Sequence, residues 1–149
     1  MEAKVDAVGV GFPVHFSSVY NTDYEKLYRL DSPEIPGVAC AWSTKHQRTG
    51  DFVIISSMKR QEWTDIITQG RGDADHWVTG YTIQYSDDGM NWTHYNYGTT
   101  IEGNSDRNTK KMHTFTAPIV ARAIEITIAK YHGHPSMRFG ALFRADAEN

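Results

Sequence analysis

Residues 70–76, with the sequence GRGDADH, hold the side chains best suited to binding a polar ligand. Arginine donates hydrogen bonds through a rigid fork, and aspartate accepts them from two adjacent hydroxyl groups. Arg71 together with Asp73 or Asp75 could therefore grip two neighbouring hydroxyls of a sugar ring. The ordinary alternative is a solvated loop, because charged side chains are exposed by default.

The same stretch contains the tripeptide Arg71-Gly72-Asp73, which suggests cell adhesion through an integrin. An integrin needs the arginine and the aspartate to project from an exposed loop tip, whereas a sugar site would draw both side chains inward. A third role is to shape the loop itself. The tripeptide alone is weak evidence, and these three roles stay open on the residues.

Histidines near residues 131–136 (YHGHPS) raise the question of a metal site. His132 and His134, with His46 or His76, could hold zinc or nickel. Such a site needs a third and usually a fourth ligand at fixed geometry, and no cysteine or HExxH partner is present. Polar loop residues are the favoured interpretation, and we predict no transition-metal site.

Catalysis has no candidate in the sequence. Asp87 and Asp88 resemble paired carboxylates, but Gly89 follows them, and an Asp-Gly pair is typical of a tight hairpin turn. No serine, cysteine or threonine has a recognisable base and orienting partner. The sequence therefore predicts a binding protein and not an enzyme.

Short apolar runs separated by turn residues about every ten positions indicate strands throughout the chain. Residues 81–86 (YTIQYS) and 123–129 (AIEITIA) alternate apolar and polar side chains, as half-buried strands require. Further expected strands are FVIIS (52–56), TDIIT (64–68), WTHYN (92–96), KMHTFTA (111–117) and MRFGALF (137–143). Residues 57–63 (SMKRQEW) are expected to form a solvated hairpin. The pattern is typical of an all-β sandwich or barrel.

Composition limits the classes of partner and of architecture. A chain of 149 residues with 40% hydrophobic content supports a single domain over residues 1–149, with a frayed tail from residue 144. The net charge of −3 offers no basic surface for nucleic acid. The lone cysteine, Cys40, cannot form an intrachain disulfide. No secretory signal is recognised, so we expect the protein in the cytoplasm, or outside the cell by non-classical export.

A long stretch of the chain resembles a known family. Residues 63–95 (WTDIITQGRGDADHWVTGYTIQYSDDGMNWTHY), followed by GNSDRNT (103–109) and ARAIEIT (121–127), are similar to the discoidin domain, also called the coagulation factor V/VIII type C domain. The similarity is greatest to the N-terminal domain of the discoidin lectins and is weaker over residues 1–40. It implies an eight-stranded antiparallel jelly-roll-like β-sandwich that binds galactose or N-acetylgalactosamine through loops at one end, in cell adhesion or recognition.

Strand alternation indicates which loops meet, since every second connection between antiparallel strands reaches the same end. The loops 70–76, 97–108 and 130–136 should converge, and by the resemblance residues 43–50 join them. The residues gathered there are His46, Arg48, Arg71, Asp73, Asp75, His76, Tyr131, His132 and His134. With the family resemblance, sugar binding ranks first for this loop end, loop shaping second and integrin binding third.

The resemblance carries over unevenly to individual residues. Arg71, Asp73, Asp75 and Trp77 stand in matching motif positions. Tyr131 stands where the discoidin lectins place a tryptophan, and we expect it to offer the stacking face. His46 is assigned by loop position only. The tryptophans, Trp77 included, are expected in the core or capping its end, because large aromatic side chains dominate core burial.

Two departures from the family concern calcium and assembly. Many discoidin domains bind structural calcium through an Asp-Gly pair before the early tryptophan and an acidic residue in the last strand. Here these stretches are EIPGVACAW (34–42) and MRFGALF (137–143), so the sequence does not favour a tight calcium site, although Asp31 or Glu34 could substitute. The sequence shows no counterpart of the second lectin domain of the discoidin lectins, so we expect multivalent binding to need homo-oligomers.

A membrane-binding module is the second functional class, because the coagulation-factor relatives insert apolar and basic loop tips into phospholipid. Residues 70–76 carry Asp73 and Asp75 instead of such tips. The early segment FPVHFSSVYNTDY (12–24) does hold Phe12, Val14, Phe16 and Tyr20 for lipid contact. An intracellular protein-binding module is the third class.

Overall fold

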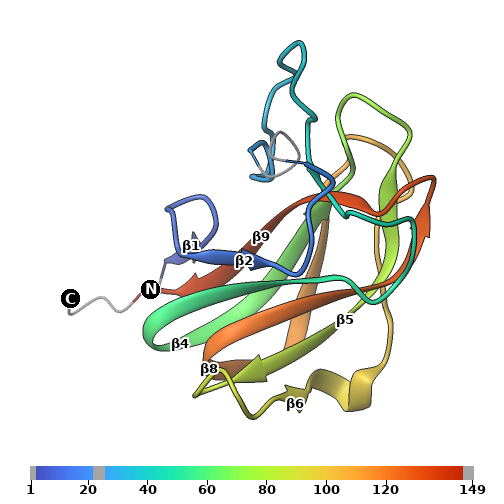
Figure 1. Ribbon diagram of the computed structural model, residues 1–149. Helices are drawn as coiled ribbons and strands as arrows, with labels where there is room; N and C mark the ends of the chain where they lie inside the picture. Colours follow the sequence, from blue (N-terminus) through green and yellow to red (C-terminus); the bar gives the residue numbers. More distant parts are fainter. Residues whose placement is uncertain (1–2, 22–25, 146–149) are drawn as a thin grey trace.

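The computed structural model describes residues 3–21 and 26–145, and these residues form an all-β protein (Figure 1). The strands are β1 (Lys4–Asp6), β2 (Val14–Phe16), β3 (Trp42–Ser43), β4 (Phe52–Gln69), β5 (Trp77–Ser86), β6 (Thr93–His94), β7 (Ile101–Glu102), β8 (Lys111–His132) and β9 (Ser136–Arg144). A short 3₁₀ helix, η2 (Tyr95–Gly98), follows β6. All pairings between these strands are antiparallel, and the predicted all-β sandwich is confirmed.

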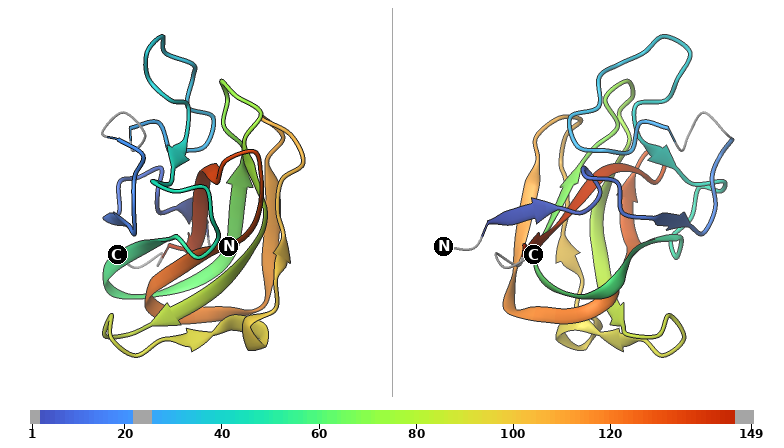
Figure 2. Two further views of the ribbon diagram at one scale, coloured as in Figure 1. Left: turned by 45° about the vertical axis from the view of Figure 1, so that its right-hand side comes forward. Right: turned by 90° about the vertical axis from the view of Figure 1, so that its left-hand side faces the viewer.

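Two long strands, β4 and β8, pass through both layers of the sandwich. Residues 61–69 of β4 pair with the first part of β8 and with β9, which also pairs with β1. Residues 52–56 of β4 pair with β2 and with residues 123–127 of β8, whose other edge pairs with β5. Both strands bend at the same end of the molecule (Figure 1 and Figure 2). Each therefore supplies one arm to each layer.

These bends correct three of the expected element boundaries. FVIIS and TDIIT belong to one strand, β4, and KMHTFTA and AIEITIA belong to one strand, β8. The expected hairpin at residues 57–63 is absent from β4, because Ser56 pairs with Ala123 and Gln61 pairs with Ala121 of the same partner strand. The intervening residues form a bulge, which bends a strand without reversing it. The predicted return of the chain to the loop end still holds, because each bend redirects its strand.

The core lies between the layers, where alternate residues of the facing strands point inward. Its largest fully buried side chains are Trp42, Trp63, Tyr81, Phe139, Ile55, Ile66, Ile83, Ile124, Ile126, Ile128, Met137 and Val8. The indole N–H of Trp63 donates to the carbonyl of Ala121 at 2.9 Å, and that of Trp42 donates to the carbonyl of Ser18 at 2.8 Å. Both buried indole N–H groups are therefore hydrogen-bonded, as is usual for buried tryptophan side chains.

The first segment of the chain packs onto this core, which removes most of the lipid-contact surface proposed for it. The Phe12 ring lies 5.0 Å from Phe143, and the Phe16 ring lies 5.5 Å from Trp42. Val14 is also partly buried against the core, and only Tyr20 of the four expected residues is well exposed, at 55%. Three of the four side chains thus stabilise the sandwich.

The end of the chain is ordered further than the sequence predicts. Arg144 closes β9, pairs with Lys4 of β1 and forms an ion pair with Glu62 at 2.8 Å. The Ala145 amide donates to the carbonyl of Ala3. The expected fraying at residues 144 and 145 is therefore wrong, and residues 146–149 lie outside the described residues.

The hairpin after β5 forms as predicted, but the strand expected after it is short. The Asp88 carboxylate accepts hydrogen bonds from the Met90 and Asn91 amides, both at 2.8 Å, and Gly89 has a φ of 75°. These hydrogen bonds lower the pKa of Asp88. WTHYN yields only the two residues of β6, and the chain then turns through η2. Within the described residues, no helix is long and apolar enough to span a membrane.

Candidate binding site at the loop rim

Four loops meet at the end of the sandwich opposite the bends of β4 and β8. We call them the rim: residues 44–50, 70–76, 103–109 and 130–136. In Figure 1 the loops 70–76 and 103–109 lie near the top of the view. The predicted convergence holds for these ranges, but Tyr97 and Gly98 of the expected loop 97–108 lie in η2, at the opposite end of the sandwich.

Arg71 and Asp73 bind each other within the loop 70–76. The Arg71 guanidinium donates to both carboxylate oxygens of Asp73, at 2.7 and 3.2 Å. The Cys40 amide donates to the same carboxylate at 3.1 Å, and the Arg71 amide donates to the carbonyl of His76 at 2.9 Å. Burial opposes ionisation of Asp73, but the hydrogen bonds from Arg71 and Cys40 outweigh it and lower the pKa of Asp73. The ion pair between Arg71 and Asp73 therefore holds the loop 70–76 closed.

The adhesion tripeptide is consequently held against the protein. Arg71 and Asp73 have side-chain exposures of only 14% and 29%. A side chain at Gly72 would place its Cβ 2.7 Å from the Cys40 sulfur, so the glycine is required by packing. The two charged groups are directed at each other and do not project separately from a loop tip, which is the geometry that loop shaping needs.

Beneath the rim, a buried arginine ties four segments together. Arg138 of β9 is 3% exposed. Its guanidinium donates to the carbonyls of Gly70 at 2.8 Å, Ser32 at 3.0 Å and Arg107 at 3.0 Å, and to the Asn108 side chain at 2.8 Å. This role was not predicted from the sequence. Its signal was an arginine inside the otherwise apolar strand MRFGALF.

Asp75 pairs with Arg107, and not with Arg71. Arg107 Nε donates to Asp75 Oδ1 at 2.7 Å, and the two side chains are 41% and 71% exposed. The hydrogen bond from Arg107 and its charge lower the pKa of Asp75. This exposed pair offers a carboxylate and a guanidinium side by side, which is the combination predicted for Arg71 and Asp73 or Asp75.

A cavity of about 370 Å³ adjoins this pair. It is lined by Asp75, Trp77, Asp106, Arg107, Asn108 and Thr109. We call it the Trp77 cavity. Asp106 holds its wall, because its carboxylate accepts from the Thr109 amide at 2.8 Å and from the Thr109 hydroxyl at 2.7 Å. Arg107 and Asn108 belong to the GNSDRNT motif of the family resemblance but were not predicted as site residues.

Trp77, and not Tyr131, supplies the aromatic face at this cavity. The His132 ring stacks on Trp77 with centroids 4.5 Å apart and planes at 12°. The Tyr131 hydroxyl instead donates to the carbonyl of Gln47 at 3.1 Å, and the ring packs against the core. Register shifts between Val78 and Tyr81 reverse the side-chain alternation of β5 and β8, so Trp77 lies on the outer side. Trp77 thus lies at the end of the sandwich and not within the core, and Tyr131 does not line this cavity, so its expected stacking role stays a prediction.

The rim histidines differ in their surroundings. His46 is exposed, and His134 Nε2 donates to the carbonyl of Thr44 at 2.8 Å. His76 is half-buried, its ring lies 6.0 Å from that of His134, and its Nδ1 is buried without a hydrogen-bond partner. Burial and the charge of Arg71 lower the pKa of His76, which keeps it neutral at pH 7. Across residues 3–21 and 26–145, no three His, Cys, Asp or Glu side chains gather closely enough to hold a metal.

The two substitute calcium ligands lie beside cations. Asp31 accepts a hydrogen bond from Lys110 Nζ at 2.6 Å and from Gln69 Nε2 at 3.2 Å. Asp31 and Glu34 line a cavity of about 320 Å³ together with the guanidinium of Arg138. Lys110 and Gln69 lower the pKa of Asp31 through these hydrogen bonds. Asp31 is therefore paired with Lys110, and Glu34 shares its cavity with Arg138.

Comparisons with known proteins agree with this architecture. The sequence profile of the F5/8 type C domain matches residues 13–140. Discoidin-2 of Dictyostelium discoideum is 39% identical over 99 residues, which is 66% of this chain and 38% of the relative. The structure of recombinant discoidin II of D. discoideum superposes with a TM-score of 0.92 at 30% identity, over 97% of this chain and 60% of that one. The chain thus spans less than half the length of three discoidin relatives, with 48%, 38% and 46%.

More distant structures share the fold alone. The family 32 carbohydrate-binding module of NanJ from C. perfringens, solved in complex with galactose, has a TM-score of 0.62 at 20% identity. The match covers 96% of this chain and 100% of that one. At this identity the likeness establishes a shared sandwich and leaves the binding residues to be argued from this chain.

Proposed function

Because the chain belongs to the F5/8 type C, or discoidin, domain family, we propose that it is a carbohydrate-binding module whose site is the Trp77 cavity. The observation that carries the proposal is the composition of that cavity: one indole, one exposed carboxylate-guanidinium pair, one amide, and the hydrogen-bonded Asp106 and Thr109, around about 370 Å³. Small-ligand sites commonly have volumes of roughly 300 to 1,000 Å³ and a few polar groups that fix orientation.

Trp77 would receive the C–H face of a sugar ring. His132 covers one face of the indole and fixes its orientation, which reduces the ordering cost of binding. Aromatic side chains contribute both area and a defined stacking geometry. The stack of His132 on Trp77 therefore prepares a rigid platform before any ligand arrives.

Asp75, Arg107 and Asn108 would bind the hydroxyl groups. Asp75 is ionised at neutral pH, and Arg107 lowers its pKa further, so Asp75 can accept from two adjacent hydroxyls while Arg107 donates. Arg138 holds the Asn108 side chain and the Arg107 carbonyl from below. The polar groups are thus positioned by the fold and need little rearrangement on binding.

We propose terminal galactose or N-acetylgalactosamine as the sugar. The family resemblance supports this class, and so does the chemistry, because the axial 4-hydroxyl of galactose leaves a continuous C–H patch for stacking on an indole. We further propose that binding needs no calcium, since cations of the protein surround Asp31. Display on an oligomer would convert a weak single site into adhesion or recognition.

A glycan array probed with the purified protein, with calcium and again with chelator, tests the proposal. We expect selective binding to galactose or N-acetylgalactosamine termini that the chelator does not change. A blank array with folded protein would overturn the carbohydrate assignment, and selective binding that disappears with chelator would overturn its independence of calcium.

A further inference from the structure

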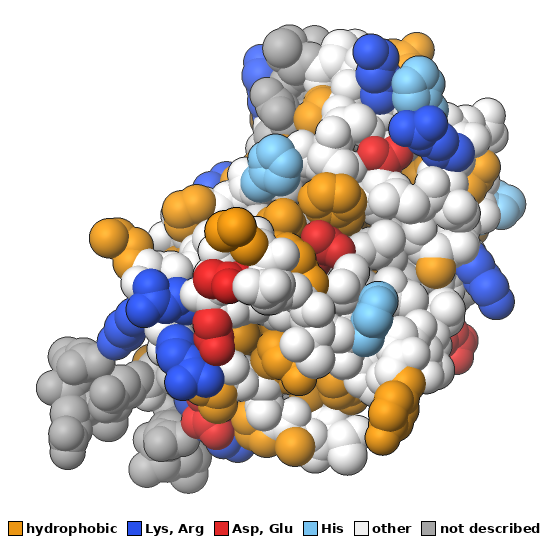
Figure 3. Space-filling view, turned by 60° about the horizontal axis from the view of Figure 1, so that its bottom comes forward, with side chains coloured by type: hydrophobic (Ala, Val, Ile, Leu, Met, Phe, Trp, Pro, Cys, Tyr) orange, Lys and Arg blue, Asp and Glu red, His pale blue; other side chains and the backbone are white. Residues whose placement is uncertain are grey.

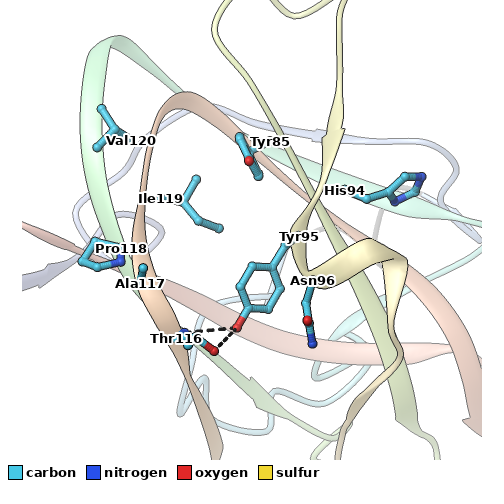
Figure 4. A pocket seen from close by; sticks show the side chains of 9 residues that line it. All are labelled: Tyr85, His94, Tyr95, Asn96, Thr116, Ala117, Pro118, Ile119 and Val120. Carbon is cyan, nitrogen blue, oxygen red and sulfur yellow. Dashed lines mark hydrogen bonds between the residues drawn. The ribbon is translucent and has the colours of Figure 1, made fainter.

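A cavity larger than the Trp77 cavity lies at the opposite end of the sandwich from the rim. It has a volume of about 550 Å³ and is lined by Tyr85, His94, Tyr95, Asn96, Thr116, Ala117, Pro118, Ile119 and Val120 (Figure 4). We call this end, with the bends of β4 and β8, the hairpin 87–91 and η2, the far pole. Figure 3 turns the lower end of Figure 1 toward the viewer and shows hydrophobic side chains scattered over this face among charged side chains, histidines and other atoms.

Tyr95 gives this cavity a fixed floor. Its hydroxyl accepts from the Thr116 amide at 3.2 Å and contacts His113 Nε2 at 3.1 Å. The ring is 9% exposed and packs edge-on against Phe115 with centroids 4.8 Å apart. Figure 4 shows Tyr95 and Ile119 directed into the space between β8 and η2. The cavity is therefore lined by anchored groups.

A bulge of β8 forms one wall of the cavity. Thr114 pairs with Asp65 and Ile119 pairs with Trp63, so residues 115–118 of β8 face the single residue Thr64 of β4. Thr116, Ala117 and Pro118 are exposed along this bulge. Bulges re-aim side chains and interrupt the ladder, and they are frequent beside functional sites. Thr116 of this bulge lines the cavity, and its hydroxyl lies 3.4 Å from the Tyr95 hydroxyl.

The opposite wall includes an unusual backbone. Asn96 and Tyr97 are consecutive residues with left-handed φ angles of 50° and 58°, and neither is glycine. Left-handed backbone costs free energy in non-glycine residues and tends to persist where the surrounding fold uses it. Its effect here is to hold the Asn96 amide at the cavity while the Tyr97 ring is 99% exposed beside it.

The lining selects a neutral ligand that is both apolar and hydroxylated. Among the described residues, no Asp, Glu, Lys or Arg side chain lines the cavity, so nothing in its lining compensates a charged ligand. A purely apolar ligand would desolvate Thr116, Asn96 and His94 without replacing their hydrogen bonds, which is costly. A neutral sugar residue offers a C–H face to Tyr85 and Tyr95, and hydroxyls to the polar groups. We propose that the far-pole cavity is a second carbohydrate-binding site, independent of the rim.

Such a site would make one copy of the domain bivalent. The rim and the far pole lie at the two ends of the same strands. Their two ligands would therefore be bound at opposite ends of the sandwich. A single chain could then bridge two glycans without forming oligomers. The far-pole site depends on its own residues and does not require the Trp77 cavity to bind sugar.

The test is a titration of ¹⁵N-labelled protein with the methyl glycosides of galactose, N-acetylgalactosamine, glucose and mannose, followed by NMR. We expect at least one sugar to move the amide signals of residues 95–98, 119 and 120 saturably. Ala117→Trp should abolish these shifts by filling the cavity, whereas Met90→Trp, which adds the same indole to the 83% exposed hairpin position, should keep them. The Trp77 indole signal reports the rim separately.

The outcomes separate the two sites. Far-pole shifts in a Trp77→Ala variant support the second site even if the proposed rim function fails. Unmoved far-pole signals with all four sugars, or shifts that survive Ala117→Trp, would overturn the inference. A decaproline peptide serves as a probe for a protein ligand. If this peptide saturates the same signals and none of the four sugars does, the inference is overturned and the cavity is assigned to a protein ligand.

Discussion

The rim and the far pole close the same strands, but the cavities at these two ends differ in the charge of their linings. At the rim the exposed groups include the ion pairs Arg71–Asp73 and Arg107–Asp75. At the far pole the exposed side chains include Met58, Met90, Tyr97 and Val120, with exposures of 96%, 83%, 99% and 50%. The rim can orient hydroxyls by charge-assisted hydrogen bonds, whereas the far-pole cavity offers uncharged polar groups beside aromatic and aliphatic side chains.

The two rim ion pairs show a second contrast. Arg71 and Asp73 are mostly covered and also bind Cys40 and backbone, so they hold the loop 70–76 in shape. Arg107 and Asp75 are more exposed and border a cavity, so a ligand can replace the water molecules around their charged groups. Arg71 and Asp73 of the tripeptide thus hold the loop together, and we propose that Asp75 and Arg107 belong to the ligand site.

The largest effect should come from Arg138, on which the rim rests. Arg138→Met removes four hydrogen bonds and leaves buried carbonyls unpaired, so we expect a loss of about 3 kcal/mol of unfolding free energy. Urea unfolding monitored by tryptophan fluorescence measures it. Arg144→Met, which breaks the partly exposed pair with Glu62, is the matched control and should cost less than about 1 kcal/mol. Equal losses in both variants would contradict the supporting role of Arg138.

Trp77→Ala should remove the stacking platform while leaving the core intact. We expect binding of N-acetylgalactosamine at the rim to weaken by about 2 kcal/mol, or about thirtyfold. Isothermal titration calorimetry provides the measurement. Trp92→Ala, at the half-buried tryptophan beside the far hairpin, is the control and should leave rim binding unchanged. Retained affinity in Trp77→Ala would place the rim ligand elsewhere.

Arg107→Ala tests which ion pair binds the ligand. Rim affinity should fall about tenfold, and unfolding free energy should change by less than about 0.5 kcal/mol because the pair is exposed. Arg60→Ala breaks a comparable exposed pair with Asp87 at the far pole and should change neither. Arg71→Ala should instead lower the free energy of unfolding, because the ion pair of Arg71 with Asp73 is mostly covered. Two results together would reverse the roles of the two arginines. Arg71→Ala would keep its stability but lose sugar affinity, and Arg107→Ala would keep its sugar affinity.

Acid should destabilise the protein in a defined window. Burial lowers the pKa of both His76 and His113 in the fold, so below about pH 6.5 the unfolded chain binds protons that the folded chain does not. Stability should therefore be nearly constant from about pH 8 to about pH 7 and decline as the pH falls through about 6.5. Thermal unfolding across this range measures it. The decline should be smaller in His113→Gln, and an unchanged decline in both His113→Gln and His76→Gln would rule out these histidines.

The fold class and the meeting of the rim loops could be predicted from the sequence, because alternation and turn residues are local signals. Prediction failed where a bulge changes the register. Trp77 and Tyr81 are both odd-numbered residues of β5, yet the shifts around Gly80 place them on different sides. The same shifts place His132, and not Tyr131, against the Trp77 ring. A bulge depends on the partner strand, which periodicity in one strand does not contain.

Partners that are distant in the sequence were the second source of error. Asp75 and Arg107 are separated by 32 positions, and Arg138 binds segments as far away as Ser32. Nothing in the residues 70–76 indicates that Asp75 faces Arg107 and not Arg71. The bends of β4 and β8 are another such feature, since the bulges that produce them arise from mismatched pairing between the two strands.

A crystal structure of the protein soaked with N-acetylgalactosamine tests the central claim most directly. The proposed function predicts the sugar ring against the Trp77 indole, with its hydroxyls bound to Asp75 and Arg107. A ring bound at the rim to Arg71, His46 or Tyr131 and away from Trp77 would contradict it.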